Sequence, residues 1–171
     1  MKETPKQYTQ RMLGNVAGKN PLAVQAATAG KLARLTRGLS GAQLRRRPAP
    51  GKWSIGEILA HLADAEIVAG YRFRMMLNSS GGVIPAFDQN DWARNGRYDR
   101  IDPKRSLQAF TAMRVYNLAL LKSLKPAMRK RYGMHAERGK ESVAHYTRMM
   151  AGHDLNHLAQ VERIARGFRC R

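Results

Sequence analysis

The chain has 171 residues, of which 43% are hydrophobic and 25% charged, a composition that indicates one globular domain and excludes intrinsic disorder. Fifteen glycines and seven prolines exclude collagen-like and low-complexity classes. The single cysteine, Cys170, excludes a disulfide scaffold and a cysteine-rich zinc site, and it favours a reducing, cytoplasmic setting. Lysine and arginine outnumber acidic residues by 31 to 12, and the resulting formal charge of +19 raises nucleic acid as a partner.

The distribution of this positive charge does not favour nucleic acid. The tight basic cluster Arg45–Arg47 precedes Pro48 and Pro50 in a predicted loop, without an RNA-binding aromatic motif or zinc-finger spacing. A basic soluble protein is the favoured interpretation, and the alternatives are anionic ligands or weak, salt-sensitive contact with nucleic acid. No apolar run approaches the roughly 20 residues of a membrane helix, and the N-terminus lacks the apolar core of a signal peptide, so no membrane partner is predicted.

Helical periodicity dominates the chain, and no strand is predicted. The first long helix is expected over residues 21–39, because Asn20 suits the N-cap and Pro21 the first helical position. Gly38 marks its end. Residues 42–52 then form a proline-rich connector to the next helix.

The second helix is predicted to begin after Ser54, which stands three residues before a glutamate, the spacing of a capping box. The polar and glycine-rich run at 78–82 ends it. A long loop follows over residues 81–102, and its aromatic content indicates that it packs on the domain. The third helix begins at Pro103, with Asp102 as its cap.

The fourth helix is predicted over residues 140–166, after a connector that contains Gly133 and Gly139. Side chains recur along it at intervals of 3 and 4, the pattern of a seam that faces other helices. The seam consists of Val143, Tyr146, Met150, His153, His157, Gln160 and Ile164. These elements predict an all-α fold: a four-helix bundle over residues 21–168 with a long loop between its second and third helices, preceded by an N-terminal extension, residues 1–20.

Histidines at core positions are the informative chemical feature. His153 and His157 are four residues apart, so both imidazoles lie on one helix face and can bind one ion. His61 lies on the apolar face of the second helix, so three histidines converge if helices two and four pack together. Because imidazole in a core costs free energy unless its nitrogens are satisfied, a bound cation is an economical explanation. Three histidines with a vacant position suit zinc, nickel or iron, whereas the alternative is three ordinary core residues.

Two segments carry a family resemblance, WSIGEILAHLADAE at 53–66 and AGHDLNHLAQVERI at 151–164. The sequence RPAPGK directly precedes the first of them, and Pro85-Ala86-Phe87-Asp88 lies in the long loop. With these features the chain resembles the DinB-like superfamily over most of residues 21–166.

The resemblance implies a four-helix bundle that holds a divalent metal ion through His61, His153 and His157, often as a homodimer. Members of the superfamily are described as metal-dependent hydrolases or as transferases that add a low-molecular-weight thiol to electrophiles. The predicted function is therefore a metal-dependent enzyme with a small-molecule substrate, acting by hydrolysis or with such a thiol. A non-catalytic, stress-related metal-binding bundle and a basic nucleic-acid-associated protein are the alternatives.

Two residues are candidates for a catalytic role. Gln160 continues the histidine stripe by one turn, where it orients a metal-bound water or bonds a neighbouring helix. Arg114 faces inward with Asn117, to meet an anionic substrate or, as the favoured alternative, to pair with Glu66. Asp154 points about 100° away from the adjacent histidine, which places it at the surface or beside a histidine N–H.

Other polar residues receive structural interpretations first. Glu57 is expected to cap its helix, with support of a metal ligand as the alternative. His135 is expected to be exposed in a loop, with covering of the pocket as the alternative, and His145 is expected to be exposed. Three residues keep open alternatives between packing or ion pairing and lining a substrate pocket: Arg72, Phe87 and Trp92.

Overall fold

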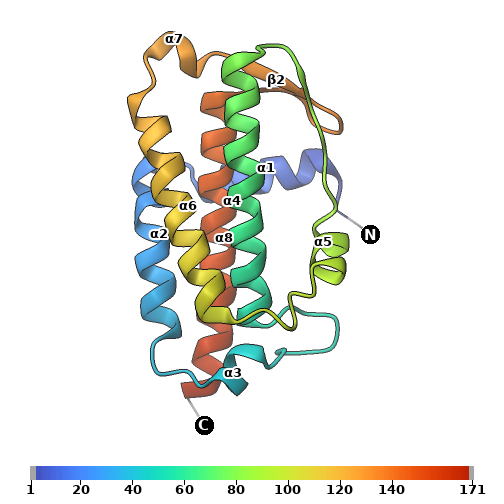
Figure 1. Cartoon of the computed structure of the whole chain (residues 1–171), viewed down its shortest axis with the longest axis vertical. Coiled ribbons are helices and arrows are strands. Elements are labelled where there is room, and N and C mark those ends of the chain that lie inside the picture. The colour runs from blue at the N-terminus through green and yellow to red at the C-terminus, as the bar shows by residue number, and fades with distance from the viewer. Residues whose placement is uncertain (1–2, 170–171) are drawn as a thin grey trace.

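Four long helices form the predicted bundle in the computed structural model, which describes residues 3–169, so that Cys170 lies outside the described residues. They are α2 (Pro21–Thr36), α4 (Ile55–Asn78), α6 (Pro103–Ser123) and α8 (Val143–Arg169). Helices α4 and α6 lie side by side and run in one direction, whereas α2 and α8 run in the opposite direction (Figure 1). This order is possible because the segment between α4 and α6 returns along the whole bundle before α6 begins (Figure 1).

The predicted helix starts are confirmed by their hydrogen bonds. The side chain of Asn20 accepts from two backbone N–H groups of α2, and Asp102 accepts from the backbone of Lys104. Ser54 and Glu57 form the predicted capping box of α4, because each side chain accepts from the other residue's backbone N–H. These caps satisfy donors that a helix start otherwise leaves unpaired.

Short elements occur where the sequence predicted only loops. They are α3 (Gly41–Arg45), β1 (Val83–Ile84), α5 (Gln89–Asn95), α7 (Pro126–Arg129), β2 (Tyr132–His135) and β3 (Gly139–Ser142). The prediction of no strands was wrong: β1 pairs with β2 in parallel and β2 pairs with β3 antiparallel. No local sequence pattern marks these strands, because β1 has only two residues and its partner strand lies about fifty residues away in the chain.

The ends of two predicted helices also shift. Helix α2 stops at Thr36, because Arg37 is extended and Gly38 adopts a positive φ of 79°. Helix α8 starts at Val143 instead of residue 140, because residues 139–142 pair with β2.

Residues 5–15 of the N-terminal extension form α1 (Pro5–Asn15), which packs across α8. Met12 is fully buried and joins the core. The contact needs a glycine, since a Cβ on Gly152 would stand 1.8 Å from the carbonyl oxygen of Met12. Arg11 donates to Asn156 at 2.8 Å on the same face of α8. The extension is therefore an integral part of the described fold.

The core consists of two apolar clusters with a polar layer between them. One cluster contains Phe73, Met76, Leu121 and Tyr146, towards the end of the bundle that carries the sheet. The other contains Leu32, Ile58, Phe110, Leu158 and Val161, towards α3. Between them lie buried polar residues from all four helices: Gln25, Thr28, His61, Glu66, Arg114, Asn117, His153, Asp154 and His157.

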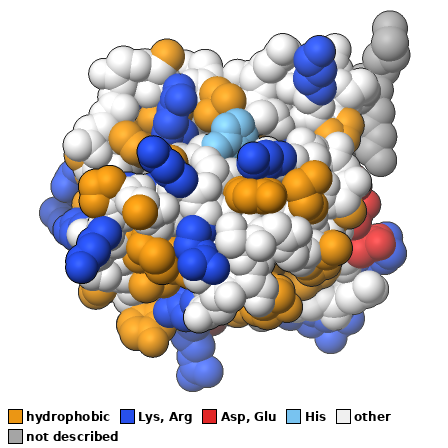
Figure 2. Space-filling model, turned by 90° about the horizontal axis from the view of Figure 1, so that it is seen from above, with side chains coloured by type: hydrophobic (Ala, Val, Ile, Leu, Met, Phe, Trp, Pro, Cys, Tyr) orange, Lys and Arg blue, Asp and Glu red, His pale blue; other side chains and the backbone are white. Residues whose placement is uncertain are grey.

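Positive charge is spread over the end of the molecule that carries α7 and β2. Figure 2 shows Lys and Arg side chains separated by hydrophobic and other groups across this end, with acidic groups only at its edge. Within the part of the chain that the structure describes, no helix is both long enough and apolar enough to cross a membrane.

Candidate functional site

Helices α4 and α8 bring the three predicted histidines together. The Nε2 atom of His61 lies 3.0 Å from that of His153, which in turn lies 3.1 Å from Nε2 of His157. One ligand atom from each ring falls within 4.8 Å of the others. All three side chains are at least 94% buried, so the cluster is a built feature of the bundle interior.

The protonation of the rings leaves lone pairs for a ligand. Burial lowers the pKa of His61 and of His153 well below the usual value, and the neighbouring His157 adds to the shift in both. Burial also lowers the pKa of His157 to about 4, although the hydrogen bond between His157 and Gln160 opposes the shift. The three imidazoles are therefore neutral at pH 7.

Gln160 fixes the tautomer of one ring. Its Oε1 lies 2.8 Å from Nδ1 of His157, and because an amide oxygen only accepts, Nδ1–H of His157 is the donor. Nε2 of His157 then carries the lone pair and faces the other two rings. This contact differs from the predicted bond to a neighbouring helix, since Gln160 bonds a histidine of its own helix. The Nδ1 atoms of His61 and His153 are buried without a hydrogen-bond partner among the described residues.

A pocket of about 550 Å³ opens onto the cluster. His153 and His157 line its inner wall, and Trp53, whose ring centroid lies 5.0 Å from that of His61, lines it from the start of α4. Other walls come from α1 and α5 through Tyr8, Arg11, Gln89 and Asn90. No Asp or Glu lines this pocket, whereas Arg11, Lys52 and Arg163 do.

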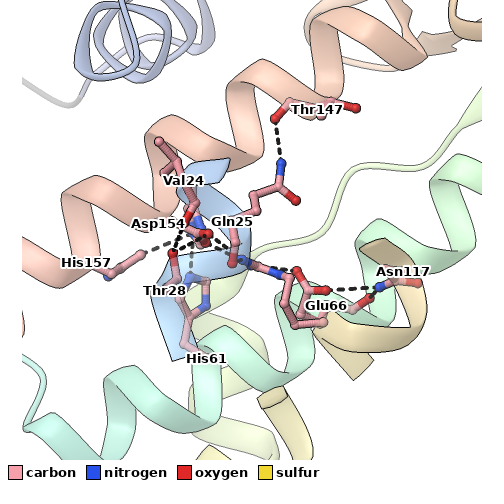
Figure 3. Close-up of polar contacts among 11 residues, drawn as sticks. Val24, Gln25, Thr28, His61, Glu66, Asn117, Thr147, Asp154 and His157 are labelled. Carbon is pink, nitrogen blue, oxygen red and sulfur yellow. Dashed lines mark hydrogen bonds and ion pairs between the residues drawn. The ribbon is translucent and has the colours of Figure 1, made fainter. Parts of the chain in front are cut away.

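Arg114 is not among the residues that line the pocket; it forms a buried ion-pair network with Glu66 and Asp154, two residues that Figure 3 labels. Its Nη2 donates to Glu66 at 2.8 Å, and both Nη atoms donate to Asp154. The predicted ion pair with Glu66 is thus confirmed. Asn117 donates to the same Glu66 at 3.0 Å, and Thr28 donates to Asp154 at 3.0 Å.

Asp154 lies where neither predicted alternative placed it. It is fully buried and it binds Arg114 and Thr28, without a hydrogen bond to a histidine ring. Periodicity correctly predicted that Asp154 points away from the face of α8 that carries His153 and His157, but that direction leads into the interface with α2 and α6 instead of solvent. Burial raises the pKa of Asp154, while the charge of Arg114 opposes this shift.

The remaining predicted residues have mainly structural contacts. Glu57 caps α4 and also pairs with Arg47. His135 is 3% exposed at the end of β2, so the expected exposure was wrong: strand pairing holds this residue inward. Phe87 and Trp92 pack on each other with ring centroids 5.0 Å apart, and neither lines the pocket.

Sequence reasoning missed most residues of the pocket wall, among them Tyr8, Arg11 and Trp53. Tyr8 and Arg11 belong to the segment that was set aside as an extension, and Trp53 was assigned only to the helix start. A signal for the first two was present, since Tyr8 and Met12 have the i, i+4 spacing of a helix face that packs on a neighbour.

The fold and the histidine cluster together match a known family. The model of the DinB superfamily matches residues 26–161. This chain belongs to the DinB superfamily. The matched range contains His61, His153 and His157, and it begins after α1.

The chain is also similar to individual proteins that are named as metal-dependent hydrolases. The chain is 27% identical over 128 residues to "Putative metal-dependent hydrolase OB0782" of Oceanobacillus iheyensis, covering 75% of this chain and 74% of that protein. A relative from Geobacillus thermodenitrificans with the same descriptive name is 27% identical over 143 residues, covering 82% and 75%. The solved structure of YfiT from Bacillus subtilis superimposes with a TM-score of 0.80 at 20% identity, covering 98% of this chain and 90% of YfiT. YfiT is described as having an unusual four-helix bundle topology, and the likeness confirms the fold.

Proposed function

We propose that this protein is a metal-dependent enzyme that binds one divalent ion through Nε2 of His61, His153 and His157. The convergence of these three Nε2 atoms carries the proposal, because two of the three histidines, His153 and His157, also line a pocket. The names of the relatives in the superfamily support it from a second direction.

The donor set fits such an ion. Histidine nitrogens bind zinc at about 2.1 Å, and ligand angles between 90° and 110° then place neighbouring nitrogens about 3.0–3.4 Å apart. The separations of 3.0 and 3.1 Å lie at the lower end of this range. Beside the cluster, one guanidinium faces two buried carboxylates, Glu66 and Asp154, and this surplus of acidic groups favours a cation nearby. Neutral imidazole ligands suit zinc, nickel or iron.

The pocket defines the chemistry that the chain supports. A divalent ion with open positions lowers the pKa of a bound water or thiol and so supplies a nucleophile near neutral pH. The protein contributes three neutral ligands, the Gln160 contact that orients His157, and walls that admit a small molecule. Among the described residues that line the pocket, no carboxylate is present to act as a general base, so we infer that a bound ion would supply the activation of the nucleophile. A low-molecular-weight thiol in place of water would make the same site a thiol transferase.

Two broader parts of the proposal concern the setting of the protein. A homodimer is proposed on the exposed apolar side chains Ile67 and Tyr71 of α4 and Val115 and Tyr116 of α6. Light scattering of the purified protein tests it, and a monomer at micromolar concentration would contradict it. The cytoplasmic setting predicted from the cysteine content stays a prediction.

Metal analysis of untagged protein tests the central claim. We expect about one zinc, nickel or iron per chain by plasma mass spectrometry, and loss of that metal in the variant His153→Ala/His157→Ala. His145→Ala is the matched control, because this histidine lies on the same helix outside the cluster. A chain that stays metal-free after reconstitution with each of these ions, or a double variant that keeps full occupancy, would refute the proposal. The metal found is then used to screen ester and amide hydrolysis against thiol addition.

A further inference from the structure

A second buried cation lies outside the histidine cluster and has no counter-charge. Arg72 of α4 is 4% exposed. Its Nη1 donates to the hydroxyl of Tyr146 at 3.3 Å, and its Nη2 donates to the carbonyl of Pro85 at 2.6 Å. Among the described residues, no carboxylate lies within ion-pair distance of this guanidinium. A buried charge without a balancing charge is costly, which calls for an explanation at this position.

The surroundings of Arg72 offer donors without acceptors. The Nε atom of Arg72 is buried and has no partner. His135 accepts at Nδ1 from the backbone N–H of Glu137, at 3.1 Å, so its proton resides on Nε2, which is also buried and unpartnered. The hydroxyl of Tyr146 accepts from Arg72 and keeps its own hydrogen free to donate. Three donors therefore lack a shared acceptor.

These donors come from elements that the fold holds together. Strand β1 pairs Ile84 with His135, and the next residue, Pro85, carries the carbonyl that binds Arg72. The positive charges of Arg138 and Arg72, added to burial, lower the pKa of His135 to about 4. The neighbouring carboxylate, Glu141, is already bound through both oxygens by Arg138, at 2.7 and 3.0 Å. The missing partner of the cluster is thus an acceptor that the described chain does not supply.

We propose that Arg72, His135 and Tyr146 bind one anionic group, a carboxylate or a phosphate, through Nε–H, Nε2–H and O–H respectively. The ligand would balance the guanidinium charge and accept from all three donors at once. The ring of Phe87, whose centroid lies 5.7 Å from Cζ of Arg72, closes the cluster from the long loop.

The position of this cluster bears on the substrate, and this step rests on the proposed function. Arg72 lies eleven residues after His61 on α4, and Tyr146 lies seven residues before His153 on α8, which is three and two helical turns respectively. The cluster therefore lies on the same faces of α4 and α8 as the three histidines, about 10–16 Å from them along the helix axes. Tyr8, a wall residue of the metal pocket, packs against the apolar cluster that contains Tyr146. The anion is then either a free ion or the acidic end of an elongated substrate.

Anion binding to the full-length, metal-free protein tests the site independently of the metal. Crystals soaked in bromide should show an anomalous peak within hydrogen-bond distance of Arg72 Nε and His135 Nε2. In solution, phosphate and acetate at constant ionic strength should raise the melting temperature. The apparent affinity should fall at least tenfold in Arg72→Met and in His135→Phe. Arg74→Met is the matched control, since this arginine lies on the same helix and contacts Asn117 and Tyr116 instead.

The possible outcomes distinguish between the two sources of the anion and identify the result that would refute the proposal. Stoichiometric phosphate released from the denatured, purified protein would identify a resident free ion. An empty site that takes up phosphate or acetate reversibly would identify a subsite for the acidic group of a substrate. No bromide peak at the cluster, together with variants that bind anions as the unaltered protein does, would overturn the proposal and leave water as the partner. A protein that fails to hold metal still gives a clear result here.

Discussion

Removal of Arg114 should be among the most destabilising single changes in this protein. Its guanidinium is 2% exposed and pairs with Glu66 and Asp154, which are 3% and 0% exposed. The variant Arg114→Met keeps the length of the side chain and leaves both carboxylates uncompensated. Breaking a buried pair in this way costs about 3–5 kcal/mol, a large part of a total stability of about 5–15 kcal/mol.

The pH dependence of that loss distinguishes charge from packing. Burial already raises the folded-state pKa of Asp154, and without the opposing charge of Arg114 it should rise further above the unfolded value of about 3.9. A raised folded-state pKa contributes stability at low pH that is lost as pH rises through the folded value. The deficit of Arg114→Met should therefore be smaller at pH 5 than at pH 8. Adding Asp154→Asn, which removes one of the two charges, should recover part of the stability at pH 8.

Urea denaturation followed by circular dichroism at 222 nm, with a chelator present, measures these differences. The matched control is Arg166→Met, because this arginine pairs with Glu162 on the surface, where such a pair contributes about 0.3–0.5 kcal/mol. A deficit for Arg114→Met within 1 kcal/mol of the control, or one that does not change with pH, would refute the account of Arg114 as the counter-charge of the two buried carboxylates.

Three further outcomes follow from single contacts. Gln160→Ala should weaken metal binding 10- to 100-fold in a chelator competition, because it frees the tautomer of the histidine that it contacts, whereas Glu162→Gln should leave affinity unchanged. Gly152→Ala should displace α1 and expose the first 20 residues to limited proteolysis, whereas Gly167→Ala, with no atom within 4 Å of the new Cβ, should not. Ser54→Ala should lower the free energy of unfolding by about 1 kcal/mol in urea melts through loss of the α4 cap, and an unchanged value would contradict the capping assignment.

Local sequence patterns were sufficient to predict the four long helices of the bundle. Asn20, Ser54 and Asp102 act through hydrogen bonds to residues two or three positions away, so their roles can be predicted without knowledge of the fold. The same holds for His153 and His157, because a spacing of four residues alone places both rings on one face of a helix. The inward direction of Arg114 also followed from its position in the apolar stripe.

Contacts between distant segments could not be read from these patterns. Whether His61 meets the other two histidines depends on the packing of α4 against α8, ninety-two residues away along the chain. The place of α1 depends on Gly152, since only a residue without Cβ permits the close approach of Met12.

The sequence by itself determined the four long helices, the starts of α2, α4 and α6, and the pairing of His153 with His157, because those features depend on neighbours within one or two turns. The tertiary structure decided that Tyr8 and Arg11 wall the pocket, that Asp154 is buried against Arg114, and that His135 lies beside Arg72. Each of these contacts joins segments that are far apart in the chain, and their meeting is set by how the helices pack as a whole. The pairing of His153 with His157 is thus local in origin, whereas the third histidine, the pocket and the buried ion pairs arise from the assembled bundle.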